Sequence, residues 1–132
     1  MMHTIEEDNA QDFKTEHWPT DLKYKSEERA LHITFDNGES FALPAEYLRI
    51  ESPSAEVQGH HPSQKQILSG RRFVGIIAIE PVGNYAVKLT FDDLHDTGIF
   101  SWQYLYKLSI EHKTVWQNYL DELASRGLSR DP

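Results

Sequence analysis

The sequence predicts an α+β domain in which antiparallel β-hairpins form a sheet and C-terminal helices pack on that sheet. Over residues 22–44 and 72–93, apolar residues alternate with polar ones or follow one another as β-branched runs, as in strands. From about residue 101 onward the apolar residues recur with the period of a helix. Strands first and helices last are typical of α+β folds, and 132 residues suffice for one domain but not for two ordinary ones.

The first hairpin is predicted over residues 22–44. Leu31, Ile33 and Phe35 alternate with polar residues, which places them on one face of a strand. The Asp-Asn-Gly stretch at residues 36–38 predicts a tight hairpin turn, because an Asn-Gly pair favours positive φ at both turn residues.

One short helical turn is predicted next, over residues 45–50, because Pro44 suits the start of a helix. Tyr47 and Leu48 are expected to fold back on the sheet. Residues 52–69 are rich in Ser, Pro, Gly and Gln and have no apolar period. This composition predicts a long loop of the kind that is either functional or disordered.

A second hairpin is predicted over residues 72–93, interrupted at residues 81–84. Beyond these two hairpins of similar size, no internal repeat is expected. The apolar residues that define a first C-terminal helix are Trp102, Leu105, Tyr106 and Leu108. Those that define a second helix, which stops at Gly127, are Val115, Trp116, Tyr119, Leu120 and Leu123. Trp116 and Tyr119 are expected to cover the sheet, the alternative being a lid or a self-association face.

Four segments are predicted along the chain. They are a disordered tail over residues 1–17, a folded domain over 18–109, an additional helix over 110–127 and a second tail over 128–132. The formal charge of −8, from 13 Lys+Arg against 21 Asp+Glu, argues against nucleic acid as a partner, because such a surface repels phosphates.

The absence of cysteine and of long apolar runs restricts the chemistry and the location. Without cysteine the chain has no disulfides, thiolate zinc sites, iron–sulfur ligands or thiol nucleophile. No apolar run approaches the roughly 20 residues of a membrane helix, and the first residues are acidic and polar, unlike a signal peptide. We therefore expect a cytoplasmic protein with no membrane partner.

The stretch HDTGIFSW at residues 95–102 reads in part as a corner between a strand and a helix. Ser101 is a suitable helix N-cap, and Phe100 is placed to pack on Leu105 as a hydrophobic staple. Gly98 supplies the bend between the two elements.

His95 and Asp96 are not explained by that corner. A histidine close to Asp92, Asp93 and Asp96 can act as a proton shuttle or a metal ligand. A histidine hydrogen-bonded into a turn is the commoner case, and we favour it here.

Three short motifs occur in order over about residues 18–109. They are Leu48-Arg49, then Gly-x-Tyr-Ala-Val at residues 83–87, then His-x-x-Gly-Ile-Phe-Ser-Trp at residues 95–102. In order and spacing they resemble the domain at the N-terminus of gamma-butyrobetaine hydroxylase and trimethyllysine hydroxylase, a family also called DUF971. In many bacteria this domain stands alone, and it is also fused to P-loop scaffold ATPases of iron–sulfur cluster assembly.

The resemblance implies a zinc site that this chain has lost. In the hydroxylases the domain holds a structural zinc through three cysteines just after the Leu-Arg element and through the histidine that His95 matches. The segment corresponding to those cysteines, at about residues 52–57, has serines and no thiol. Serine hydroxyls are poor zinc ligands, so the inherited site is not expected to bind zinc tightly. A substitute site from His95 with His60 or His61 and a nearby carboxylate stays open as an alternative.

Catalysis is not expected. In the oxygenase superfamily the iron triad includes His-x-Asp/Glu, and no histidine here has Asp or Glu two positions later. Phosphate-binding loops, nucleophile elbows and dinucleotide fingerprints are absent from the sequence. A Ser101/His95/Asp96 site is conceivable, but Ser101 is better used as the helix cap.

The sequence therefore predicts a non-catalytic accessory or protein-interaction domain, linked by resemblance to oxygenases or to iron–sulfur assembly. The rival hypotheses are a zinc-binding protein and an enzyme centred on His95 and Asp96. No cofactor is expected apart from zinc in the first rival, and the chain is expected to be a monomer or a weak homodimer. Candidate partner-binding residues are Trp18, Tyr47, His60, His61, His95, Asp96, Trp102 and Tyr106.

Overall fold

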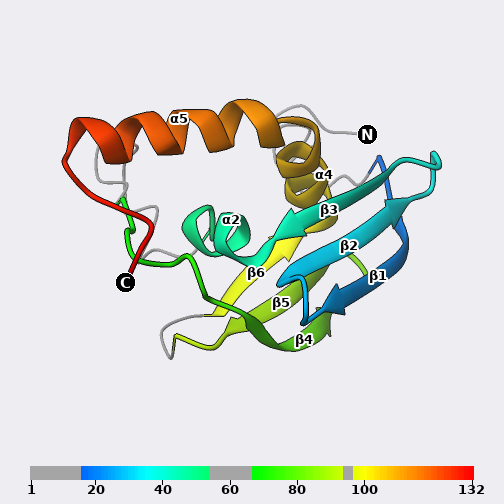
Figure 1. The fold of residues 1–132 in the computed structure, drawn as a ribbon. Coiled ribbons are helices and arrows are strands. Elements are labelled where there is room, and N and C mark those ends of the chain that lie inside the picture. Colours follow the sequence, from blue (N-terminus) through cyan, green and yellow to red (C-terminus); the bar gives the residue numbers. More distant parts are fainter. Residues whose placement is uncertain (1–15, 54–66, 94–96) are drawn as a thin grey trace, which may run out of the picture.

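The computed structural model describes residues 16–53, 67–93 and 97–132, which form two three-stranded antiparallel sheets and three helices (Figure 1). The first sheet consists of β1 (Pro19–Lys25), β2 (Ala30–Phe35) and β3 (Ser40–Pro44). The second consists of β4 (Ile76–Val82), β5 (Ala86–Phe91) and β6 (Thr97–Ser101). The helices are α2 (Ala45–Ile50), α4 (Trp102–Ile110) and α5 (His112–Ser125). The predicted α+β class is confirmed, but each predicted hairpin gains a third strand and the strands form two sheets instead of one.

One hydrophobic core serves both sheets. The central strands alternate between buried apolar and less buried polar residues, as the sequence predicted for β2. The buried large residues are Leu31, Ile33 and Phe35 on β2 and Val87, Leu89 and Phe91 on β5. Buried residues of α2 and α4, including Leu48 and Leu105, belong to the same core. Residues of both sheets, α2 and α4 therefore form one continuous hydrophobic core.

The turn between β2 and β3 differs from the prediction in its backbone. The main-chain N–H of Gly38 donates to the carbonyl of Phe35 at 2.9 Å, and the N–H of Phe35 donates to the carbonyl of Glu39 at 2.8 Å. Gly38 has a φ of 89°, whereas Asn37 does not have positive φ. The loop is therefore a three-residue turn that ends in a left-handed glycine, and the predicted positive φ at both residues is wrong.

The two halves of the described chain repeat the same β-β-β-α order, which corrects the expectation that no repeat extends beyond the hairpins. Each central strand pairs with both neighbours in matching register: Ala30 faces Pro44 just before α2, and Ala86 faces Ser101 just before α4. The register in each sheet shifts near the start of its first strand, after Pro19 in β1 and after Ile76 in β4.

Contacts between the halves match as well. The hydroxyl of Tyr47 on α2 donates to the carbonyl of Leu108 on α4 at 2.8 Å. The hydroxyl of Tyr104 on α4 donates in turn to the carbonyl of Glu51, at the end of α2, at 2.6 Å. Tyr47 and Tyr104 hold the same place in their helices, so the two halves bind each other reciprocally.

The C-terminal helices are confirmed, and the residues that follow them make contacts that were not predicted. The hydroxyl of Ser101 accepts the main-chain N–H of Tyr104 at 3.0 Å, as expected of an N-cap. Gly127, with a φ of 67°, follows α5. Residues 128–132 do not form the expected tail, because Ser129 and Arg130 accept main-chain hydrogen bonds from Gly70 and Arg72. The predicted tail over residues 1–17 lies outside the described residues except for residues 16 and 17, and so does most of the predicted loop.

Within the described ranges, every helix is too short or too polar to span a lipid bilayer.

Candidate interaction site

The Leu-Arg element places an arginine inside the molecule at the end of α2. The side chain of Arg49 is 1% exposed, and its Nε donates to Oδ2 of Asp93 at 2.7 Å. Nε of Arg71 lies 3.1 Å from the same oxygen, so one carboxylate faces two guanidinium groups. The guanidinium carbon of Arg49 also lies 6.0 Å from the centre of the Phe91 ring. These contacts fasten the end of α2 to the end of β5.

The backbone after α2 packs directly on β6. Ser52 is fully buried, and a Cβ atom at Gly98 would collide with the Ser52 hydroxyl. Glycine at position 98 is therefore needed for this close approach. The bend predicted at Gly98 is wrong, because this residue lies within β6 and pairs with Leu89.

The described residues at this corner do not fit a zinc ion. Ser52 offers only a neutral hydroxyl, and the Asp93 carboxylate is already paired with Arg49 and Arg71. Among residues 16–53, 67–93 and 97–132, no group of three or more His, Asp or Glu side chains is placed to hold a metal. The other predicted ligands, His60, His61 and His95, lie outside the described residues, as does Asp96.

The remaining predicted partner-binding residues differ in how far their side chains are exposed. Tyr47 is completely buried, which agrees with its expected packing against the sheet and leaves none of its side chain for contact with a partner. The side chain of Trp102 is half-buried and its Nε1 donates to the carbonyl of Asn84 at 2.9 Å. Trp18, in contrast, is 49% exposed just before β1.

Trp18 directly follows His17, whose ring belongs to a group of aromatic rings at the β2–β3 turn. The rings of His17 and Tyr106 stack, with centroids 4.1 Å apart and planes 22° apart. The Tyr106 ring also meets Phe35 edge-on, with centroids 4.9 Å apart. Main-chain pairing holds Trp18 to the turn, because its carbonyl accepts the N–H of Asp36 at 2.7 Å. The segment before β1, the β2–β3 turn and Tyr106 on α4 thus lie close together although they are distant in the sequence.

Carboxylates border these rings. The Tyr106 hydroxyl donates to Oε1 of Glu39 at 2.6 Å, and Nδ2 of Asn37 donates to the same oxygen at 2.7 Å. The Tyr106 bond, followed by the Asn37 bond, holds the pKa of Glu39 below its usual range, so this group stays ionised. Asp36 has one ion-pair partner in the described chain, His17 at 3.6 Å. We call His17, Trp18, Asp36, Glu39 and Tyr106 the aromatic corner.

Sequence reasoning found part of the aromatic corner. It singled out Trp18 and Tyr106 as aromatic residues near possible surfaces, but it did not predict His17, Asp36 or Glu39. The Asn-Gly turn marked the right place in the sequence. Nothing local indicated that α4 and the segment before β1 meet there.

Comparisons with known proteins identify the family and support the fold. A family model described as gamma-butyrobetaine hydroxylase-like, N-terminal, matches residues 22–106. Two proteins with NMR solution structures are 45% and 50% identical to this chain. The match to the first covers 88% of this chain and 91% of that protein's chain, with a TM-score of 0.76. The match to the second covers 87% of this chain and 86% of that protein's chain, with a TM-score of 0.75.

A crystal structure of a protein of unknown function in the DUF971 family, from Acidithiobacillus ferrooxidans ATCC 23270, is also similar. It is 35% identical, covers 69% of this chain and 91% of its own, and has a TM-score of 0.58. No curated protein matches this chain.

Proposed function

Since the chain belongs to the family of gamma-butyrobetaine hydroxylase-like N-terminal domains, we propose that it is a non-catalytic interaction domain that binds a partner protein through the aromatic corner. The observation that carries this proposal is the half-exposed Trp18, which directly follows His17, a residue whose ring stacks on Tyr106. Aromatic side chains are enriched among the residues that dominate protein–protein binding. An exposed tryptophan whose main chain is held to the β2–β3 turn is suited to such a role.

The charge of the corner indicates the chemistry of the partner. Asp36 and Glu39 are exposed carboxylates, and in the described chain neither forms an ion pair with lysine or arginine. A lysine or arginine from a partner can approach both a carboxylate and the face of Trp18, which attracts cations. We therefore propose a basic segment as the partner's contact, on a protein of oxygenase or iron–sulfur assembly machinery as the resemblance implies.

A photoreactive amino acid in place of Trp18 tests the proposal inside cells. We expect it to cross-link one or a few defined proteins. The matched control carries the same group in place of Ile99, which is 52% exposed on β6 in the other sheet. With the captured partner purified, Trp18→Ala is expected to weaken binding about tenfold or more, as for other interface aromatics. Equal cross-linking from both positions, or unchanged affinity of Trp18→Ala, would refute the proposal.

Zinc binding by His95 with His60 or His61 stays the competing hypothesis. Elemental analysis of protein purified without chelator or metal affinity resin separates the two. The interaction hypothesis expects no stoichiometric zinc, and it expects His95→Ala to leave the metal content unchanged. About one equivalent of zinc in the wild type that is lost in His95→Ala would favour the metal site.

A further inference from the structure

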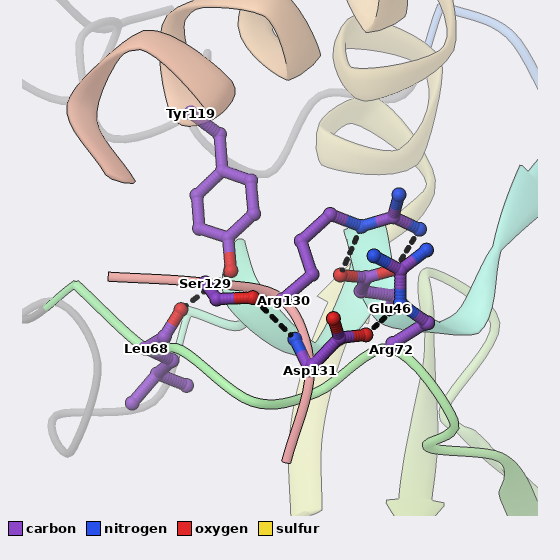
Figure 2. Close-up of polar contacts among 7 residues, drawn as sticks. All are labelled: Glu46, Leu68, Arg72, Tyr119, Ser129, Arg130 and Asp131. Atoms are coloured by element: carbon purple, nitrogen blue, oxygen red, sulfur yellow. Dashed lines mark hydrogen bonds and ion pairs between the residues drawn. The ribbon is translucent and has the colours of Figure 1, made fainter. Parts of the chain in front are cut away.

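Residues 128–132, which we call the strap, make contacts that the sequence did not predict with Glu46 on α2, Trp116 on α5 and residues 70–72. We call the surface formed by these residues the groove. The main-chain N–H groups of Gly70 and Arg72 donate to the carbonyls of Ser129 and Arg130 at 2.9 and 3.0 Å. Figure 2 shows the strap running beside the segment that holds Leu68 and Arg72, with Tyr119 pointing toward Leu68. Main-chain hydrogen bonds of this kind hold an extended peptide whatever its side chains are.

The groove has a built position for a guanidinium group. Nε and Nη2 of Arg130 donate to the two carboxylate oxygens of Glu46 at 2.9 and 2.8 Å, the paired geometry that distinguishes arginine from lysine (Figure 2). Glu46 is only 4% exposed, so its charge is largely removed from water. The guanidinium carbon also lies 5.1 Å from the centre of the Trp116 ring. A buried carboxylate and an aromatic face together recognise arginine.

The next position of the groove carries the opposite charge. Nε of Arg72 lies 2.5 Å from Oδ1 of Asp131 (Figure 2). The groove thus offers a carboxylate and then a guanidinium, and it is complementary to an arginine followed by an acidic residue. The hydroxyl of Tyr119 donates to the carbonyl of Leu68 at 2.6 Å and fixes the start of the groove-forming segment against α5.

The strap itself is held without apolar anchors. Leu128 is 41% exposed, and Ser129, Asp131 and Pro132 are exposed as well. The Arg72–Asp131 pair lies at the surface, where ion pairs contribute little. A bound segment that is held by polar contacts and buries no apolar side chain can be displaced by a competitor that offers the same groups.

We propose that this groove binds an extended segment of a partner protein in which an arginine precedes an acidic residue, and that the strap occupies the groove until that partner arrives. The proposal is independent of the aromatic corner, because it uses α2, α5 and residues 68–72 in place of the β2–β3 turn.

Peptide binding to the Arg130→Ala variant of residues 1–132 tests the proposal. In this variant the strap loses its contact with Glu46, which leaves the position open to a fluorescent peptide with the sequence of residues 126–132, RGLSRDP. Fluorescence polarisation is expected to show binding to the variant and about tenfold weaker binding to the wild type, because the tethered strap competes at high effective concentration. A peptide whose arginine is replaced by alanine is the matched control, and it is expected not to bind.

Two further variants keep the test decisive. Glu46→Gln in the Arg130→Ala background is expected to abolish peptide binding, and circular dichroism checks that it folds. If it does not fold, Arg72→Ala in that background is expected to weaken binding several-fold by removing the contact for Asp131. The proposal would be overturned if folded Arg130→Ala protein does not bind the peptide, or if it binds the control peptide with the same affinity. Wild-type dimers that grow with concentration and vanish in Arg130→Ala would also overturn it, because the occupant would then be a second copy of this chain.

Discussion

His112, the first residue of α5, lies against the buried ring of Tyr47, with ring centroids 4.3 Å apart and planes 28° apart. Burial lowers the pKa of His112 below its ordinary value of 6.5. The unfolded chain therefore takes up a proton at a higher pH than the folded chain does. Stability from this group is present above pH 6.5 and is lost as the pH falls through the ordinary histidine range toward the lowered pKa.

Replacing His112 by phenylalanine tests this linkage, because the variant keeps a ring in the stack but has nothing to titrate. Between about pH 7 and pH 5 we expect the free energy of unfolding to fall more steeply for the wild type than for His112→Phe. Urea denaturation at several pH values measures both curves. The two proteins differ only at residue 112, so the difference between their curves reports His112, and parallel curves would contradict the assignment.

Residue-level predictions from the sequence succeeded where the cause is local. The cap at Ser101 depends on the residue itself and the N–H groups of the next turn, and it was predicted correctly. The choice of Tyr47 as a candidate for partner contact does not agree with the structure, because α4 and α5 also contact this residue and leave it buried. Arg130 was assigned to a tail because its partner, Glu46, lies far away in the sequence.

The N-cap of α4 gives a prediction about a single element. Ser101 is the last residue of β6, and its side chain satisfies the free N–H of Tyr104 in the first turn of the helix. Ser101→Ala is expected to lower the free energy of unfolding by about 1 kcal/mol, the usual cost of losing such a cap. Ser101→Asp retains an acceptor and is expected to stay close to the wild type in chemical denaturation. Equal losses in both variants would mean that the hydroxyl does not act as a cap.

The strands and helices were predictable to different degrees. The hairpins and helices follow from apolar periods that belong to each segment alone. β1 was included in the first hairpin without being recognised as a separate strand, because none of its residues is buried. β6 was not predicted as a strand, because it is five residues long with a glycine at its second position. Each becomes a strand by pairing with a central strand that has a strong apolar pattern. Strand pairing depends on both segments, so the apolar pattern of one segment alone does not predict it.

The β-β-β-α repeat of the two halves was not predicted from the sequence for a similar reason. β2 and β5 share Ala, Thr and Phe at matching positions, and both α2 and α4 contain a Tyr-Leu pair. These similarities are short and separated by dissimilar loops, so they become clear only when the sheet registers align them. The corner at Arg49 and Asp93 and the aromatic corner then occupy related places, since Arg49 and Tyr106 each reach from their helix to the turn of the other half.

The two reciprocal tyrosines test whether the halves support each other equally. Tyr47→Phe and Tyr104→Phe each remove one hydroxyl that donates to a carbonyl of the other half, and burial raises the pKa of both phenols. Each change is expected to lower the free energy of unfolding by about 1–3 kcal/mol, because a desolvated acceptor is left without its donor. Tyr24→Phe is the control, since in the described chain the Tyr24 hydroxyl makes no hydrogen bond. It is expected to change stability by less than about 0.5 kcal/mol.

Comparable losses for Tyr47→Phe and Tyr104→Phe in urea denaturation would support two halves that contribute equally to stability. A large loss at one position with none at the other would mean that one half folds without help from its counterpart.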